Sequence, residues 1–408
     1  MTVRLKDYEE IVGSETLTEL DAVASHVRHL KLQNINSTAV GGGVAEILTR
    51  IIPFLNELGV QATWDVIKGD EAFFEVTKAF HNALHGKREE ISDEMLQVYR
   101  ATTEANLETM DLHGDMIFVH DPQPAGLIAR RKQGQYWGWR CHIDVSSPQQ
   151  DVWNFLHAFV RNYDLAVFSM PDFAQTLDIP QYMIAPSIDP LSEKNKELEA
   201  QYVTGVLEKY GVDPGRPILT QVSRFDRLKD PLGVIKAYRM VRKKLDCQLV
   251  LAGGTASDDP EGEQVLAEIH RESEADPDIH VLLLPPFSDL EINALVRGST
   301  IVLQKSLREG FGLTVTEALW KKKPVIGGAV GGIRLQVLDG VTGFLVHSSE
   351  GAAHRAIQLL SDPRLCTELG ENGHLHVKQN FLILRHLKDY MLMMLALQYP
   401  NDDIVDLV

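Results

Sequence analysis

Two glutamates, Glu309 and Glu317, stand at the ends of a segment that could bind a ligand. The apolar run 301–304 precedes the segment and a helical pattern follows, which predicts a turn from a strand into a helix. Gly310 and Gly312 let the backbone approach a ligand, and the first N–H groups of the helix form an anion site. Because carboxylates accept hydrogen bonds from hydroxyls, the segment predicts a ligand with both phosphates and hydroxyls, such as a nucleotide sugar.

The same two acids could instead be the acid pair of a glycosidase. If the whole segment were helical, eight steps of ~1.5 Å would place Glu309 and Glu317 about 12 Å apart, with side chains roughly 80° apart around the helix. Hydrolases place their two carboxyls ~5 to 9.5 Å apart, facing one bond. The spacing therefore disfavours hydrolysis and suits two hydrogen-bonding duties on one elongated ligand.

Two cations lie in the loop after the predicted strand 218–222. Arg224 and Lys229 are five residues apart, and a helix is predicted to begin at Pro231. A planar guanidinium and a mobile ammonium suit a diphosphate, which gains charge as its bond to a sugar breaks. Two surface cations in a helix-capping loop are the alternative that this spacing leaves open.

Histidine stands near an acid at the ends of two consecutive predicted strands. His120 directly precedes Asp121, and His142 lies two residues before Asp144. A histidine at the carboxyl end of a strand can bind a sugar hydroxyl or transfer a proton, although a lone core histidine is commoner. Neither pair has a third partner at metal-ligand spacing, so no metal site is predicted.

Two glycine clusters could also approach a ligand. The cluster 41–43 follows Asn36 and Ser37 and opens an amphipathic helix, which indicates an anion site or a close-approach loop. It is not the G-x-G-x-x-G fingerprint, and no acid follows where an NAD site would need one. The cluster 327–332 is a weaker look-alike, of the kind that is more often a turn than a cofactor site.

Composition and charge narrow the function classes. A length of 408 residues, 44% of them hydrophobic, favours two globular domains. The formal charge of −17 argues against nucleic acid or an anionic membrane as a partner, since both bind basic stripes. The lysine run 321–323 is interpreted as a solvated turn between a helix and a strand.

The cysteines and the apolar segments bear on localisation. Cys141, Cys247 and Cys366 match neither a disulfide framework nor a zinc pattern, which fits a reducing cytoplasm. No stretch approaches the ~18 to 20 apolar residues of a membrane span, and the first residues lack a signal-peptide pattern. We therefore expect a cytoplasmic protein with no membrane partner.

Short apolar runs alternate with longer helical patterns along the chain, as is typical of α/β units around parallel sheets. A proline-containing polar segment, 185–195, separates two halves. We predict a domain 1–188, completed by the C-terminal helix (about 385–408), and a domain 189–384. The predicted strands, six in each half, are 31–36, 61–67, 115–120, 136–141, 164–168 and 182–185, then 218–222, 248–252, 280–284, 301–304, 324–327 and 343–346.

These motifs together resemble those of the retaining GT-B glycosyltransferases that share an E-x7-E signature. Here the signature runs from Glu309 to Glu317, the segment 223–225 with Lys229 resembles the group's phosphate-binding Arg and Lys, and 339–346 is similar to its last strand. The resemblance covers both domains. It implies an α/β protein of the GT-B fold, with two Rossmann-like doubly wound domains facing a central cleft.

Longer strings in the first domain resemble, more narrowly, the trehalose glycosyltransferring synthases, which join glucose from a nucleoside-diphosphate glucose to free glucose. The strings are 36–38 with 41–48, 119–125, 139–148 and 187–195. The loop 226–231 departs from the Pro-Trp-Lys-Gly form of the archaeal synthases. Lys229 is kept, so phosphate binding is still expected, and the base preference stays open.

The resemblance implies a role for each matched residue. The implied catalytic residues are Glu309, His142, Asp144, Arg224 and Lys229. The implied donor-binding residues are Gly42, Gly43, Arg224, Lys229, Glu309, Gly310, Phe311, Gly312, Leu313, Thr314 and Glu317, with the cations on the diphosphate, Glu309 on the glucose hydroxyls and Glu317 on the ribose. The acceptor-side candidates are Asn36, Ser37, His120, Asp121 and His142, and the first domain would hold the acceptor.

In this group the leaving diphosphate is usually drawn as taking the acceptor's proton on the same face of the sugar. The resemblance implies no tightly bound cofactor and leaves stimulation by Mg²⁺ open. The Met-rich last helix is interpreted as a core-covering helix that could also serve a homodimer contact. Alternatives are a trehalose phosphorylase, another retaining GT-B glucosyltransferase, an epimerase acting on the donor alone, and a non-catalytic sugar-nucleotide sensor.

Overall fold

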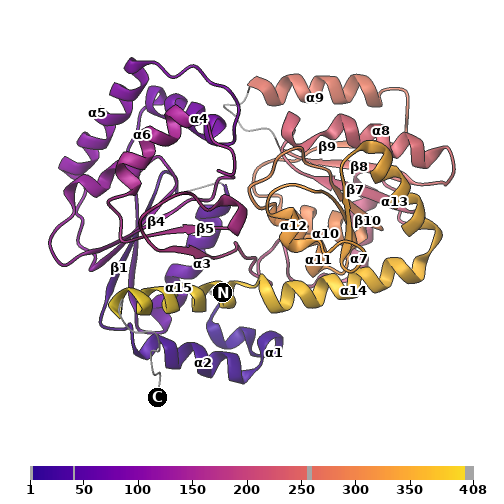
Figure 1. Ribbon diagram of the computed structural model, residues 1–408. Coiled ribbons are helices and arrows are strands. Elements are labelled where there is room, and N and C mark those ends of the chain that lie inside the picture. Colours follow the sequence, from indigo (N-terminus) through magenta and orange to yellow (C-terminus); the bar gives the residue numbers. More distant parts are fainter. Residues whose placement is uncertain (1–2, 40–41, 255–259, 400–408) are drawn as a thin grey trace. The chain divides into compact units, whose positions relative to one another are not determined.

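The computed structural model describes residues 3–39, 42–254 and 260–399, which form two compact units (Figure 1). Unit 1 consists of residues 1–187 and 383–408, and unit 2 of residues 188–382. The division lies within two residues of the boundaries that the sequence predicts, on either side of unit 2. The C-terminal helix belongs to unit 1, as the prediction has it, although residues 400–408 lie outside the described part.

Unit 1 is built on a parallel sheet of six strands in the order β2-β1-β3-β4-β5-β6. The strands are β1 (Lys31–Asn36), β2 (Gln61–Val66), β3 (Met116–His120), β4 (Tyr136–Arg140), β5 (Leu165–Phe168) and β6 (Gln181–Met183). The helices are α1 (Glu9–Val12), α2 (Ser14–Ser25), α3 (Gly42–Glu57), α4 (Glu71–Leu84), α5 (Asp93–Thr109), α6 (Gln150–Val160) and α15 (Ile383–Gln398).

Unit 2 repeats the design with the strand order β12-β11-β10-β7-β8-β9, again all parallel. The strands are β7 (Ile218–Val222), β8 (Gln248–Gly253), β9 (Ile279–Leu283), β10 (Ile301–Gln304), β11 (Val325–Gly328) and β12 (Gly343–Val346). The helices are α7 (Ala200–Lys209), α8 (Pro231–Arg242), α9 (Pro260–Ser273), α10 (Asp289–Gly298), α11 (Leu313–Trp320), α12 (Ile333–Gln336), α13 (Ser349–Ser361) and α14 (Pro363–Asn380).

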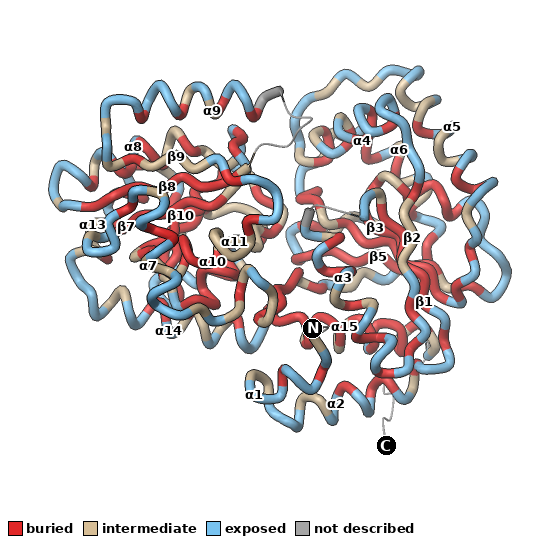
Figure 2. Tube along the Cα trace, turned by 180° about the vertical axis from the view of Figure 1, so that it is seen from behind, coloured by how far each residue is buried: buried red, intermediate tan, exposed pale blue. Residues whose placement is uncertain are grey.

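Each of the twelve predicted strands is confirmed, because every predicted range overlaps one observed strand. Central strands such as β3, β7 and β10 are buried along their whole length (Figure 2). Helices cover both faces of a parallel sheet, so such strands appear in the sequence as continuous apolar runs. In both sheets the carboxyl ends of the strands meet at one edge, and this edge positions the candidate site.

The last helix, α15, packs against α2 and α3 of unit 1. Its residues Met391, Met393 and Met394 are buried there. Lys388 also forms an ion pair with Glu19 of α2, at 3.1 Å. These contacts support the interpretation of α15 as a core-covering helix.

The interpretation of residues 321–323 as a solvated turn is wrong for Lys321. Its side chain is buried and donates to the Oδ1 of Asn195 at 2.8 Å and to the carbonyl of Glu317 at 3.1 Å. Burial lowers its pKa to about 7, against the charge of Glu317, which acts to raise it. Lys321 follows directly on α11, so the last turn of that helix directs it inward, while the next residue, Lys322, is exposed.

Candidate active site

The loop after β7 holds Lys229 in a fixed place at the carboxyl edge of the unit 2 sheet. Asp226 accepts a hydrogen bond from the backbone N–H of Lys229 at 3.1 Å, and Gln221 donates to its carbonyl at 2.7 Å. Asp230 follows in a left-handed conformation, with φ of 51°, and caps the first turn of α8. Its carboxylate also pairs with the buried ammonium of Lys305, so the loop is tied to the end of β10.

Glu309 lies against this loop because β7 and β10 are neighbours in the sheet. Its Oε2 accepts hydrogen bonds from the Nζ of Lys229 at 2.7 Å, the Oγ of Ser306 at 3.1 Å and the Nε2 of Gln304 at 3.4 Å. Within the described part of the chain no hydrogen bond reaches Oε1. One oxygen of the buried carboxylate is therefore held by the protein, and the other keeps its accepting capacity for a hydroxyl.

The start of α11 follows Glu309 by four residues and lacks a side-chain cap. Gly312 is the N-cap, with φ of 82°, and no side chain caps the first N–H groups. Leu313 and Thr314 therefore begin a helix whose positive dipole end is free to meet an anion. The estimate that treated the whole segment from Glu309 to Glu317 as helical is wrong, because only residues from Leu313 onward are helical.

The glycine cluster after β11 supports the acid-bearing turn, a role that the sequence reasoning missed. A Cβ on Gly331 would lie 1.7 Å from the carbonyl oxygen of Glu309, and one on Gly332 would lie 2.6 Å from the Phe311 ring. The N–H of Gly332 donates to the carbonyl of Gly310 at 3.1 Å. The segment 327–332 is thus a close-packing surface beneath the site.

The two remaining polar residues of the donor side differ in exposure. The Arg224 side chain is 65% exposed and lies 3.5 Å from Asp226, so its guanidinium is open to a ligand. Glu317 is buried within α11. The structure therefore brings Lys229, Glu309 and the start of α11 together, with Arg224 on the same loop as Lys229.

In unit 1 the two predicted histidines lie in direct contact, because β3 and β4 pair side by side. The Nδ1 of His120 is 3.1 Å from the Nε2 of His142, and the rings are stacked with centroids 5.4 Å apart. On the other side, the Nε2 of His120 is 3.1 Å from the Oδ1 of Asn34 on β1. Asp121 accepts a hydrogen bond from the backbone N–H of His142 at 2.8 Å.

Burial sets the protonation of this group. It lowers the pKa of His120 to about 3 and that of His142 well below its usual value, and the positive charge of Arg140 adds to both effects. Burial raises the pKa of Asp121 to about 6, against the hydrogen bond from His142 and the charge of Arg140. Sequence reasoning missed Asn34 and Arg140, although a buried asparagine and arginine on apolar strands are an available signal.

Unit 1 also holds the catalytic candidate Asp144, the acceptor-side candidate Asn36 and the donor-side candidates Gly42 and Gly43. Asp144 accepts from the backbone N–H of Ser146 at 3.0 Å, as in a tight turn. Asn36 donates to the carbonyl of Thr38 at 2.7 Å and accepts from the Trp64 indole at 2.8 Å. Gly42 and Gly43 begin α3, and Gly41 of the same cluster lies outside the described residues.

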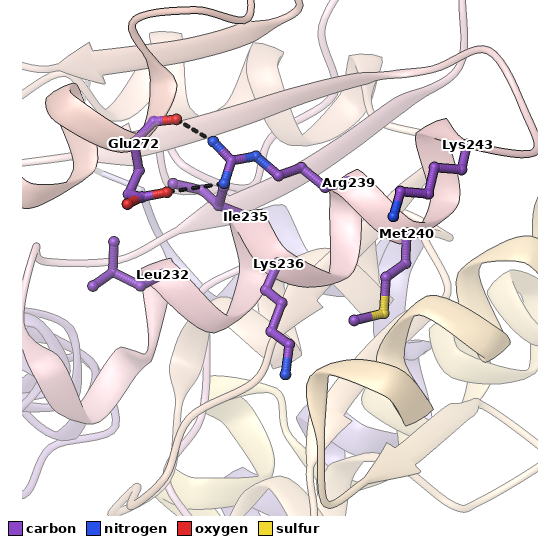
Figure 3. Close-up of a pocket in the computed structure, with 7 residues that line it drawn as sticks. All are labelled: Leu232, Ile235, Lys236, Arg239, Met240, Lys243 and Glu272. Carbon is purple, nitrogen blue, oxygen red and sulfur yellow. Dashed lines mark hydrogen bonds and ion pairs between the residues drawn. The ribbon is translucent and has the colours of Figure 1, made fainter.

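Within the described ranges, no group of three or more His, Cys, Asp or Glu residues is arranged to hold a metal ion. No helix there is long and apolar enough to cross a membrane. A surface hollow of about 450 Å³ lies elsewhere in unit 2 (Figure 3). It is lined by one face of α8 along its whole length and by Glu272 of α9. None of the lining residues belongs to the candidate site, so we assign it no part in catalysis. The lining residues are Leu232, Ile235, Lys236, Arg239, Met240, Lys243 and Glu272.

Comparison with known proteins decides the family. A family model described as "Trehalose synthase, N-terminal domain" matches residues 34–175, and one described as "Glycosyl transferases group 1" matches residues 206–376. The trehalose synthase of Thermococcus litoralis is 46% identical over 395 residues, which cover 95% of this chain and 96% of that protein. The chain belongs to the trehalose synthase family.

More distant proteins are similar to this chain in sequence or in fold. The trehalose phosphorylase of Grifola frondosa is 31% identical over 91% of this chain, which spans 58% of that protein. The trehalose-6-phosphate synthase OtsA has a TM-score of 0.71 at 13% identity, covering 92% of this chain and 99% of that chain. Anabaena HepE, solved with UDP and glucose, has a TM-score of 0.64 at 15% identity, covering 90% of this chain and 100% of that chain. The enzyme has the GT-B fold and is a glycosyltransferase that acts on trehalose.

Proposed function

We propose that the enzyme transfers glucose from a nucleoside-diphosphate glucose to free glucose, with retention, and so forms α,α-trehalose. One observation carries the proposal. The Lys229 ammonium and the Glu309 carboxylate are in contact beside the uncapped start of α11. Cation, hydroxyl acceptor and anion site thus lie together, as a sugar diphosphate requires. HepE, with a similar fold, was solved with UDP and glucose.

In this mechanism the bond between glucose C1 and the diphosphate oxygen breaks, and a bond forms from C1 to the anomeric oxygen of the acceptor glucose. The acceptor's proton passes to the leaving diphosphate oxygen on the same face. Lys229, Arg224 and the N–H groups of Leu313 and Thr314 stabilise the charge that the diphosphate gains. Glu309 Oε1 binds a hydroxyl of the transferred glucose and fixes its orientation. Unit 2 binds the donor in this proposal, and unit 1 supplies the acceptor groups.

Proton NMR of the product tests the reaction. UDP-glucose or ADP-glucose incubated with glucose should give one anomeric doublet, because the two halves of α,α-trehalose are equivalent. Two different anomeric environments, or product formation that does not depend on glucose, would reject the proposal. The reverse reaction, trehalose with UDP or ADP, should regenerate a sugar nucleotide if transfer is reversible.

A phosphorylase is the second candidate, because the Grifola frondosa relative carries that name at 31% identity. Trehalose incubated with inorganic phosphate would then yield glucose 1-phosphate. We expect none, since a nucleoside diphosphate fills both the phosphate and the ribose positions of the proposed site.

A matched pair of variants tests the residue assignment. Glu309→Gln should lower kcat/KM by about 100-fold or more, the usual effect of removing one charged group that binds the transition state. Glu350→Gln is the control, because Glu350 forms an ion pair with Lys236 at the same 2.7 Å separation on an exposed face of unit 2. Undiminished turnover in Glu309→Gln would remove that residue from the mechanism.

Three further properties belong to the same proposal. We expect a cytoplasmic homodimer whose turnover Mg²⁺ stimulates without being required, since the cations of unit 2 already face the diphosphate position. Light scattering measures the mass of the homodimer in solution, fractionation of cells tests the cytoplasmic location, and activity with and without EDTA tests the effect of Mg²⁺. Loss of all activity in EDTA would show that a metal ion is essential.

A further inference from the structure

Four side chains from three neighbouring strands of unit 1 are joined end to end by hydrogen bonds. Asn34 comes from β1, His120 from β3 and Arg140 from β4, with His142 just after β4. The successive separations are 3.1 Å from Asn34 Oδ1 to His120 Nε2, 3.1 Å from His120 Nδ1 to His142 Nε2, and 3.5 Å from His142 Nδ1 to Arg140 Nε. Asn34, His120 and Arg140 are each at most 1% exposed.

The arginine end decides the direction of every hydrogen bond in this line. A guanidinium can only donate, so the Nδ1 of His142 must be the acceptor. A neutral imidazole has one donor and one acceptor, so the Nε2 of His142 carries its proton and donates to the Nδ1 of His120. The Nε2 of His120 then carries its proton and donates to the Oδ1 of Asn34. The tautomers of both His120 and His142 therefore follow from the one fact that the Arg140 guanidinium can only donate.

The Arg140 end is itself held in place. Its Nη2 donates to the carbonyl of Ile184 at 2.8 Å, and its guanidinium carbon lies 5.5 Å from the centre of the Tyr390 ring. A proton added to His142 would turn an N–H toward the Nε–H of Arg140, which repels it. The titratable or charged groups that interact with the two histidines or with Arg140 are Asp121, Cys141, Arg385, His386 and Tyr390.

We propose that Arg140 and Asn34 are positioning residues that hold His120 and His142 in their Nε2–H forms, so that the protein itself occupies every ring nitrogen of the pair. His142 then neither donates nor accepts a proton during transfer, and its fixed ring serves as a wall of the acceptor site. The assignment to the acceptor site rests on the proposed function, whereas the direction of the chain does not.

Nitrogen-15 NMR of the histidine rings tests the direction of the chain on the whole protein, without substrate. The signals of His120 and His142, assigned through His→Gln variants, should show the Nε2–H form from about pH 5.5 to 8.5, a range in which a free histidine titrates. A titration near pH 6.5, or an Nδ1–H form in either ring, would overturn the proposal. Arg140→Met should release the His142 tautomer, and unchanged signals in that variant would also overturn it.

Asn34→Asp gives the functional test with almost no change in shape. A carboxylate in place of the amide favours a protonated His120 and breaks the order of the chain. Turnover of this variant should fall about tenfold per pH unit below the new histidine pKa, while the wild type stays flat over that range. Asn154→Asp, on the exposed face of α6, is the control for added charge. An Asn34→Asp profile that matches the wild type would refute the positioning role, whereas a wild type that makes no trehalose would refute only the proposed function.

Discussion

Replacement of Lys321 by methionine should change how the stability of unit 2 depends on pH. The ammonium is buried between Asn195 and the carbonyl of Glu317, and burial lowers its pKa from 10.5 to about 7. At about 1.4 kcal/mol per pH unit, this difference corresponds to a cost of about 5 kcal/mol for keeping the buried amine charged. Methionine has a similar length and no charge, so Lys321→Met removes this cost.

The direction in which stability changes with pH follows from the number of protons that the folded and unfolded states bind. Below about pH 7 the lysine is protonated in both the folded and the unfolded state, so its full cost is present and does not vary. Between about pH 7 and 10 the unfolded state binds the proton and the folded state does not, so wild-type stability rises with pH. The stability of the wild type minus that of Lys321→Met should therefore increase with pH in this window, with a slope that approaches about 1.4 kcal/mol per pH unit, and by about 2 kcal/mol from pH 7 to 9.

Fluorine NMR of 5-fluorotryptophan protein in urea can measure this difference for unit 2 alone. The chain has five tryptophans, and Trp320, next to Lys321, is the one that lies in unit 2. Lys322→Met is the matched control, because Lys322 is exposed and pairs with Glu371 at the surface. Its difference from the wild type should stay constant with pH. If the stability difference between the wild type and Lys321→Met were also constant with pH, it would refute the claim that Lys321 loses its proton near pH 7 in the folded state.

Three further predictions concern the two sites. Glu309→Gln and Lys229→Met should each lower kcat/KM, and the double variant should lose less than the sum of the two free-energy changes, since the groups share one hydrogen bond; additive losses would show that they act separately. Gly331→Ala should lower both the thermal stability and kcat, because its Cβ would overlap the Glu309 carbonyl, whereas Gly340→Ala, with open space around it, should cost only about 1–2 kcal/mol of left-handed strain and no activity. The pKa of Asp121 is about 6, so the stability of the wild-type protein relative to Asp121→Asn should fall as the pH rises from about 4 to 6. In this range the folded state holds a proton that the unfolded state has released. A stability difference that does not change with pH, measured by thermal unfolding at several pH values, would contradict this prediction.

The strands of both sheets could be predicted from the sequence more completely than the geometry of the candidate site. Strands such as β7 and β10 are buried on both faces, so continuous apolar runs in the sequence predict them. Lys229 and Glu309 each follow one of these strands, which places both residues at the carboxyl edge of the sheet. A helix start after β10 was predicted, but its exact position was not, because Gly312 in a left-handed conformation delays the helix until Leu313. Helical periodicity alone does not show where such a turn ends.

Contacts between distant strands escaped prediction for a different reason. Asn34 and His120 are separated by 86 positions, and only the register of β1 with β3 brings them together. A buried polar residue on an apolar strand signals that a partner exists, but the sequence does not name that partner. Lys321 is the same case on a helix, since its partner Asn195 is 126 positions away.

The return of α15 to unit 1 imposes an order on folding during synthesis. Residues 188–382 form a continuous unit, which can close as soon as it leaves the ribosome. Unit 1 must wait for the helix that packs on α2 and α3 and brings Tyr390 to Arg140. Until then its apolar faces stay open to chaperones or to neighbouring chains, so the half of the protein made first is the half that is finished last.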